Sequence, residues 1–154
     1  PQPVSPMAKI VKAPDLAGLT LLRSSQTVPP PSPDQAVLET FPNRHPQRDY
    51  EVSFDCPEFT SVCPVTGQPD FGRITIRYIP DRSCIESKSL KYLLLSFRNH
   101  PTFHEEAVNR VLDAVVRGSR PRRAEVIGEF RPRGGIAITV RAVHEATGKK
   151  RNRT

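Results

Sequence analysis

Between residues 50 and 143 the spacing of apolar side chains changes twice, and this limits the folds open to the chain. Residues 50–54 alternate apolar with polar side chains and residues 73–79 are rich in β-branched ones, as is typical of strands. Residues 87–97 and 102–115 then carry apolar side chains at helical spacing, and residues 125–130 and 136–143 are again typical of strands. The order ββααββ predicts an α+β fold, an antiparallel sheet with two helices on one face.

The predicted ends of the second helix come from its flanking residues. Thr102 is the expected N-cap, and Glu105 follows it at the capping-box spacing. Gly118 and Pro121 are expected to end the helix. In this interpretation the carboxylate of Glu105 serves the helix and not a ligand.

The ends of the chain differ from its middle. Ten of the 17 prolines fall within the first 46 residues. We therefore expect an extended, partly disordered arm over residues 1–45, a folded domain over residues 46–145 and a basic tail over residues 146–154.

The net charge of +7 is concentrated in the last part of the chain, because residues 117–154 carry 11 Lys and Arg against 3 Asp and Glu. Such a region can face phosphate groups, either of a nucleotide cofactor or of nucleic acid, or it can be a solvated tail. We interpret residues 146–154 as a solvated tail, and Arg131 and Arg133, in a turn-like stretch, are the candidate phosphate contacts.

Assembly and cellular setting follow from composition. The hydrophobic content is 36% with no tryptophan, and an open sheet leaves two long edges, so we expect a homo-oligomer. No apolar run approaches the roughly 18 residues of a membrane helix, and no secretory pattern is visible. The three cysteines have unrelated spacings, which favours a reducing, cytoplasmic setting.

Residues 59–71 contain the most chemically suggestive pair, Cys63 and Asp70, in a loop that prolines and Gly67 should hold in one shape. A cysteine in a polar loop can have the access and thiolate character of a nucleophile, with Asp70 as its nearest proton donor. The alternatives are a small buried cysteine and an ordinary turn aspartate. A zinc site that combines Cys56 and Cys63 with His104 lacks the usual close cysteine pair, so we expect no metal.

Four segments in this order resemble the NADPH-dependent 7-cyano-7-deazaguanine reductases, the QueF family, in its single-module form. They are residues 59–71, 86–91, 96–100 and 103–105, and the resemblance, which covers roughly residues 45–143, includes residues 132–135. The resemblance implies a tunnelling fold, whose unit is ββααββ. It also implies reduction of the nitrile of 7-cyano-7-deazaguanine to 7-aminomethyl-7-deazaguanine in queuosine biosynthesis, with NADPH as the cofactor.

The resemblance also implies roles for individual residues. Cys63 would form a covalent thioimide with the nitrile carbon, and Asp70 would protonate the nitrogen. His104 and Glu105 would hold the guanine-like ring. The residues implied at the substrate from a neighbouring subunit are Ile85, Glu86 and Ser87, and those implied at NADPH are Lys88 and Lys91.

Some features depart from this family, and two other functions stay open. Residues 120–127 contain Arg and Ala where the family suggests aromatic side chains. A zinc-dependent hydrolase of the GTP cyclohydrolase or pterin type on the same fold would need bound metal. A basic nucleic-acid-binding module would lose affinity steeply with salt.

Overall fold

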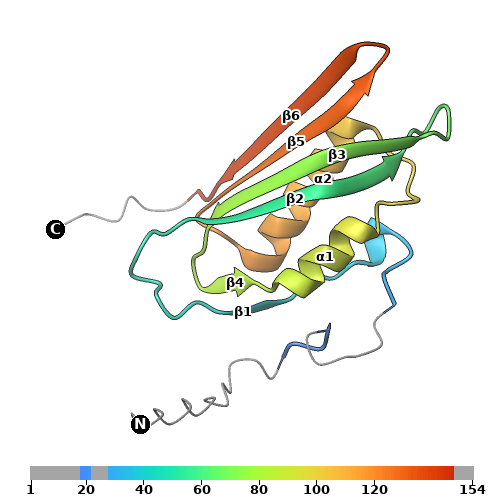
Figure 1. Ribbon diagram of the computed structural model, residues 1–154. Coiled ribbons are helices and arrows are strands. Elements are labelled where there is room, and N and C mark those ends of the chain that lie inside the picture. The colour runs from blue at the N-terminus through green and yellow to red at the C-terminus, as the bar shows by residue number, and fades with distance from the viewer. Residues whose placement is uncertain (1–17, 22–27, 148–154) are drawn as a thin grey trace, which may run out of the picture.

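The computed structural model describes residues 18–21 and 28–147 (Figure 1). In chain order the elements are a 3₁₀ turn (Pro33–Gln35), β1 (Thr40–Pro42), β2 (Val52–Val62), β3 (Pro69–Ile79), β4 (Ser83–Ile85), α1 (Ser87–Leu95), α2 (His104–Ser119), β5 (Arg123–Arg133) and β6 (Ile136–Glu145). The sheet order is β2-β3-β5-β6, all antiparallel, and β1 pairs with β4 in a separate small sheet. The predicted α+β fold is confirmed.

The hydrophobic core lies between the four-stranded sheet and the two helices, which cover the same face (Figure 1). Strands present every second side chain to that face, and helices present every third or fourth. Both patterns meet here in a set of side chains that are at most 1% exposed: Ile74, Ile76 and Tyr78 of β3 with Val108, Val111 and Val115 of α2.

Close contact between α2 and β5 depends on Gly128. A Cβ at this position would lie 2.5 Å from Cγ2 of Val108 and 2.8 Å from the ring of Phe130. Real Cβ atoms do not approach so closely, so the absence of a side chain sets how near the helix lies to the sheet.

The hairpin of β2 and β3 is longer than predicted, and residues 63–68 alone connect its strands. Asp70 therefore lies in β3, opposite Ser61, and not in a loop as predicted. The proline and polar residues near the turn are not typical of a strand, so the sequence did not indicate this part of the hairpin. Pro69 is tolerated because it is the first residue of β3. Between Cys56 and Phe59 the register shifts, so the ladder skips Pro57 and Glu58.

The prediction of a Thr102 N-cap was wrong. The N-cap of α2 is Phe103, which has no side-chain capping bond, and the Thr102 hydroxyl donates to the Phe103 carbonyl at 3.3 Å. The backbone N–H of Thr102 donates to the carbonyl of Val62 at 3.0 Å, which ties this residue to the end of β2. The capping box with Glu105 consequently does not form.

The other end of α2 also differs from the prediction. The helix continues through Gly118 and ends at Ser119, before Pro121, and its C-cap Arg120 adopts a left-handed conformation with φ of 45°. Gly118 serves packing instead, because a Cβ there would lie 3.2 Å from the Cβ of Leu38. Similarly, α1 ends at Leu95, slightly before the predicted residue 97.

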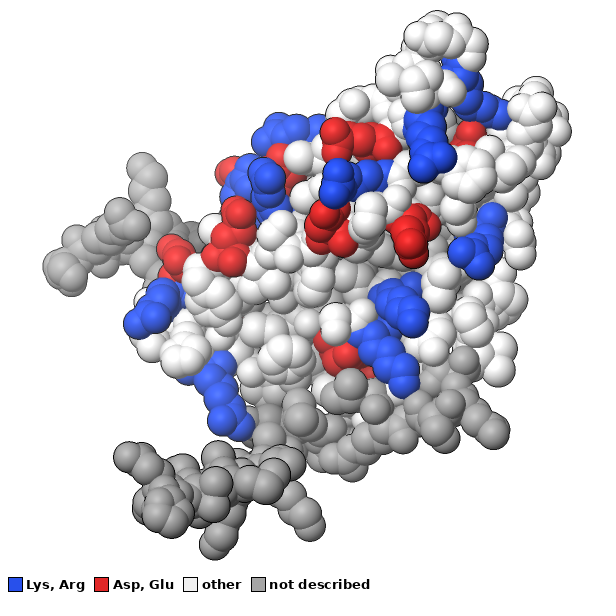
Figure 2. All heavy atoms as spheres, viewed as in Figure 1, with Lys and Arg blue, Asp and Glu red and all other residues white. Residues whose placement is uncertain are grey.

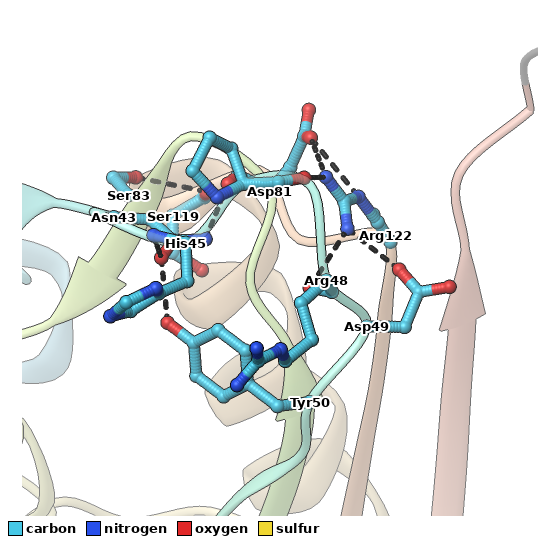
Figure 3. Close-up of polar contacts among 10 residues, drawn as sticks. Asn43, His45, Arg48, Asp49, Tyr50, Asp81, Ser83, Ser119 and Arg122 are labelled. Atoms are coloured by element: carbon cyan, nitrogen blue, oxygen red, sulfur yellow. Dashed lines mark hydrogen bonds and ion pairs between the residues drawn. The ribbon is translucent and has the colours of Figure 1, made fainter.

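A polar network fixes the segment before β2 against the rest of the domain (Figure 3). The guanidinium of Arg122 lies between Asp81 and Asp49, at 3.0 Å and 2.6 Å. Asn43 donates to the carbonyl of Asp81 and accepts a 2.7 Å hydrogen bond from the hydroxyl of Tyr50. β1 lies inside the predicted arm and pairs with β4, and the division of the chain at residues 45 and 46 stays a prediction.

Acidic and basic side chains are interleaved over the middle of the face seen in Figure 2. Ion pairs also cross the strands of the sheet, between Arg73 and Asp55 and between Arg141 and Glu125. In the described residues no helix is long and apolar enough to cross a membrane. Residues 148–154 of the predicted basic tail and residues 1–17 and 22–27 of the predicted arm lie outside the described residues.

Candidate functional site

A cavity of about 370 Å³ lies where the β2–β3 hairpin turn, the start of α2 and the β5–β6 turn meet. Its nucleophilic and charged lining residues are Cys63, Asp70, His104, Glu105, Arg131 and Arg133. The structure therefore brings together six residues that the sequence singled out. They come from three segments that are distant in sequence.

The turn after β2 positions Cys63. Its backbone N–H donates to the carbonyl of Gln68 and its own carbonyl accepts from the N–H of Gly67, both at 2.9 Å. Gly67 has φ of 70°, a conformation that glycine adopts without strain. These bonds close the turn and hold a partly exposed Cys63 at the cavity.

Hydrogen bonds to the sulfur lower the pKa of Cys63 to about 6. The largest contribution comes from the side chain of Thr66, followed by the backbone N–H groups of Thr66 and Val65, and then by the side chain of Arg133. All of these donors favour the charged form. At neutral pH Cys63 is therefore mostly a thiolate, which is the nucleophilic form.

The other cysteines differ in this respect. Burial raises the pKa of Cys56, and Cys84 is buried beside the hydroxyl of Tyr50 at 3.4 Å. Neither lines the cavity.

Asp70 is the buried centre of the site and is only 5% exposed. Its Oδ1 lies 3.0 Å from Nη1 of Arg133, and its Oδ2 lies 3.3 Å from Nε2 of His104. The imidazole of His104 stacks on the ring of Phe130 with a centroid distance of 3.9 Å and an interplanar angle of 2°. This stacking fixes the plane of the imidazole.

Nε2 of His104 is buried but is not aligned for a hydrogen bond to Asp70, and no other described residue bonds to it. Buried polar atoms in native proteins normally have a partner. Since His104 lines the cavity, this nitrogen is available to a bound molecule.

Glu105 is exposed in the first turn of α2 and also lines the cavity. Its backbone carbonyl accepts from the side chain of Asn109 at 2.8 Å, whereas its carboxylate has no hydrogen bond or ion pair within residues 18–21 and 28–147. A free carboxylate on the rim can accept hydrogen bonds from neighbouring N–H donors of a ligand.

The residues predicted around the start of α1 do not reach this cavity. The carboxylate of Glu86 caps α1 by accepting from the N–H groups of Lys88 at 2.7 Å and Ser89 at 2.8 Å. Ile85 is also buried, whereas Ser87 is exposed. α1 begins beside β4, away from the hairpin turn (Figure 1).

The predicted cofactor lysines also lie on α1. Nζ of Lys88 donates to the carbonyl of Leu21 at 2.6 Å, and Nζ of Lys91 lies 6.0 Å from the ring centroid of Tyr92. Their role at NADPH stays a prediction. Nη1 of Arg133, the predicted phosphate contact, lies 3.0 Å from Oδ1 of Asp70, and its role at phosphate also stays a prediction.

Sequence reasoning missed two residues of the site, Thr66 and Phe130. Thr66 acts through a turn hydroxyl, for which the sequence carries no signal. Phe130 could have been expected on the inner face of the strand predicted over residues 125–130. Among the described residues no group of three His, Cys, Asp or Glu side chains is placed to hold a metal ion.

Comparison with known proteins gives a family and named relatives. The family described as QueF-like protein matches residues 69–149. NADPH-dependent 7-cyano-7-deazaguanine reductases from Neisseria meningitidis serogroup B and Bacillus licheniformis are each 53% identical over 124 residues, which is 80% of this chain and 79% and 75% of theirs. The enzyme of that name from Streptococcus thermophilus is 52% identical over 80% of this chain and 76% of its own.

A solved structure, the archaeosine synthase QueF-Like in the apo form, superimposes with a TM-score of 0.56. It covers 64% of this chain and 95% of its own, at 21% sequence identity. This likeness concerns the fold alone, and the fold is the tunnelling fold that was predicted.

Proposed function

This chain belongs to the QueF family of NADPH-dependent 7-cyano-7-deazaguanine reductases, and we infer that it reduces the nitrile of 7-cyano-7-deazaguanine to 7-aminomethyl-7-deazaguanine in queuosine biosynthesis. The observation that carries this function is a thiol with a lowered pKa in the same cavity as a buried carboxylate. A nitrile carbon is an electrophile that a thiolate can attack, and its nitrogen then needs a proton.

We propose that Cys63 and Asp70 carry the covalent step. The thiolate of Cys63 forms a bond to the nitrile carbon, and the carboxylic acid of Asp70 gives its proton to the nitrile nitrogen. The products are a thioimide on Cys63 and the carboxylate of Asp70, so atoms and charge balance. The position of Asp70 in β3 supports this role, because the strand holds the carboxyl group rigidly at the cavity.

Recognition of the ring is assigned to α2. A guanine-like ring offers an amino group and a ring N–H side by side, and a carboxylate accepts from both. Glu105 has such a carboxylate without an internal partner, and Nε2 of His104 is a second polar atom without one. Together they would hold the nitrile at Cys63.

NADPH supplies hydride when bound, and two hydrides account for the four electrons of the reduction. Lys88 and Lys91 lie one turn apart on α1, which suits contact with a polyanion. The amides of Lys88 and Ser89 are already bonded to Glu86, so we assign phosphate binding to the lysine side chains and not to the helix N-terminus.

We propose a homo-oligomer with sites at subunit interfaces, in the cytoplasm. β2 and β6 each have one long edge without a strand partner in the described residues. Ser87 is exposed but does not reach the cavity of its own chain, so its predicted contact with substrate requires the cavity of a neighbour. The three free cysteines suit a reducing compartment.

The first test measures NADPH absorbance with purified protein and 7-cyano-7-deazaguanine. We expect two NADPH oxidised per substrate, and a protein mass increased by one substrate when NADPH is omitted. Cys63→Ala should abolish both signals, whereas Cys56→Ala should retain them because Cys56 lies outside the cavity. Turnover by Cys63→Ala would overturn the covalent mechanism.

A further inference from the structure

We propose that Arg133 is a positioning residue, the one counter-ion shared by Cys63 and Asp70 through the covalent step. This inference rests on the proposed nitrile reduction and deepens it, since it explains how one site stabilises two successive anions. It replaces the phosphate contact that the sequence predicted for this arginine.

The guanidinium of Arg133 is held from two sides. Nη1 lies 3.0 Å from Oδ1 of Asp70, while Nη2 donates to Oγ1 of Thr66 at 3.4 Å and to Oε1 of Gln68 at 3.3 Å. The side chain also contributes to the lowered pKa of Cys63. Arg133 thus joins the end of β5 to both the nucleophile turn and the acid.

This placement matches the movement of charge in the reaction. Before addition the negative charge is on the sulfur of Cys63, and after addition it is on the carboxylate of Asp70, since the acid has given its proton to the nitrile nitrogen. A planar guanidinium with several donors can remain bonded to both positions without moving. Preorganised charge of this kind lowers the barrier because little has to reorganise.

The other charged groups around the cavity do not take this place. His104 faces Asp70 from α2, and the carboxylate of Glu105 would disfavour a nearby thiolate. Arg131 lines the cavity as well, but its guanidinium lies 5.6 Å from the ring of Phe71, with no bond to Cys63 or Asp70. Arg131 therefore provides a matched control of equal charge.

The test is the rate of alkylation of Cys63 by iodoacetamide as a function of pH, followed on the Cys63 peptide by mass spectrometry. The assay uses the full chain without substrate or NADPH, so its outcome is independent of whether the reduction itself is observed. The wild-type midpoint should lie near the Cys63 pKa of about 6. Arg133→Gln should move it upward by about one pH unit, since it removes a neighbouring positive charge.

Two further variants separate charge from fold. Arg133→Lys keeps the charge without the planar fork and should give an intermediate midpoint, and it replaces Arg133→Gln if the latter is unfolded by circular dichroism. Arg131→Gln should leave the midpoint unchanged. Midpoints of folded Arg133 variants equal to wild type, or an equal shift with Arg131→Gln, would overturn the proposal.

Discussion

Thr66 contributes most to the charge state of Cys63, although it lies in an exposed turn. Its hydroxyl accepts from Arg133 and from the N–H of Gln68, which leaves the hydroxyl proton for the sulfur. Thr66→Val removes this donor and keeps the shape of the side chain. The pKa of Cys63 should then rise from about 6 toward its ordinary value.

The sign of the effect on activity follows directly. A thiolate is present above the thiol pKa and is lost below it, so a higher pKa moves the acid limb of the rate–pH profile upward, by about one unit. Initial rates of NADPH oxidation measured across pH for Thr66→Val check this. Thr60→Val, on β2 and outside the cavity, is the control, and an unshifted acid limb in Thr66→Val would contradict the assignment.

Glu105 distinguishes ligand binding from helix capping. The structure lacks the capping box, so Glu105→Gln should change the free energy of unfolding by less than about 0.5 kcal/mol. It should raise KM about tenfold or more, because a charged hydrogen-bond acceptor for the ring is lost. Steady-state kinetics and thermal unfolding measure the two effects.

Glu106→Gln is the matched control for this change. Glu106 is exposed in the same first turn and has the same favourable position on the helix dipole, but it does not line the cavity. If both variants lose the same stability and neither changes KM, Glu105 serves only the helix.

Gly128 sets the distance between α2 and β5, and through α2 the position of His104. A Cβ there collides with Val108 and Phe130, so Gly128→Ala should cost about 1–3 kcal/mol of unfolding free energy. Val108→Ala removes one of the colliding groups. Denaturant unfolding of both single variants and the double variant should therefore show less than additive loss, by about 0.5 kcal/mol or more. Strict additivity would mean that the helix moves away instead.

The elements could be predicted wherever burial imposed a period. β3, β5 and α2 alternate or repeat because one face of each is in the core, and their order along the chain determined the fold class. β1 and β4 have three residues each, too few to show a period. The prediction of Thr102 as the N-cap of α2 failed because its backbone N–H is bonded to the carbonyl of Val62 in β2. The sequence gives no sign of this bond.

The site was predictable to a similar depth. Cys63 and Asp70 are close in sequence, and the structure places both at one cavity. The family resemblance predicted that His104 and Glu105 belong to the same site, and both line this cavity. The bonds of Arg133 depend on where the β5–β6 hairpin ends relative to the β2–β3 turn. That placement depends on the register of β2, β3 and β5, which cannot be predicted from any one segment of the sequence.

The proposed homo-oligomer is supported by the sheet edges that one chain leaves unpaired. β2 and β6, with 11 and 10 residues, form the two edges of the sheet. Within residues 18–21 and 28–147, the outer edge of β2 has one bridge, from Val62 to Pro101. Long open edges invite pairing with another chain unless they are covered. A cyclic arrangement of copies would pair β2 of one subunit with β6 of the next and leave no edge.

Subunit mixing tests whether neighbouring chains share a site. Ser87→Arg places a bulky side chain at an exposed position, so it should block substrate in the neighbour's cavity without unfolding its own chain. Cys63→Ala removes the nucleophile. Oligomers of either variant alone should be inactive, but co-expression creates interfaces that combine an intact Cys63 with an intact Ser87, and NADPH oxidation should return.

Cys63→Ala co-expressed with Asp70→Asn should stay inactive, because both residues line the cavity of one chain and every site keeps one defect. Full activity of Ser87→Arg oligomers, or no recovery in either pair with mixed oligomers present, would overturn the shared site. Recovery in the pair of Cys63→Ala with Asp70→Asn would mean that these two residues do not act from one chain.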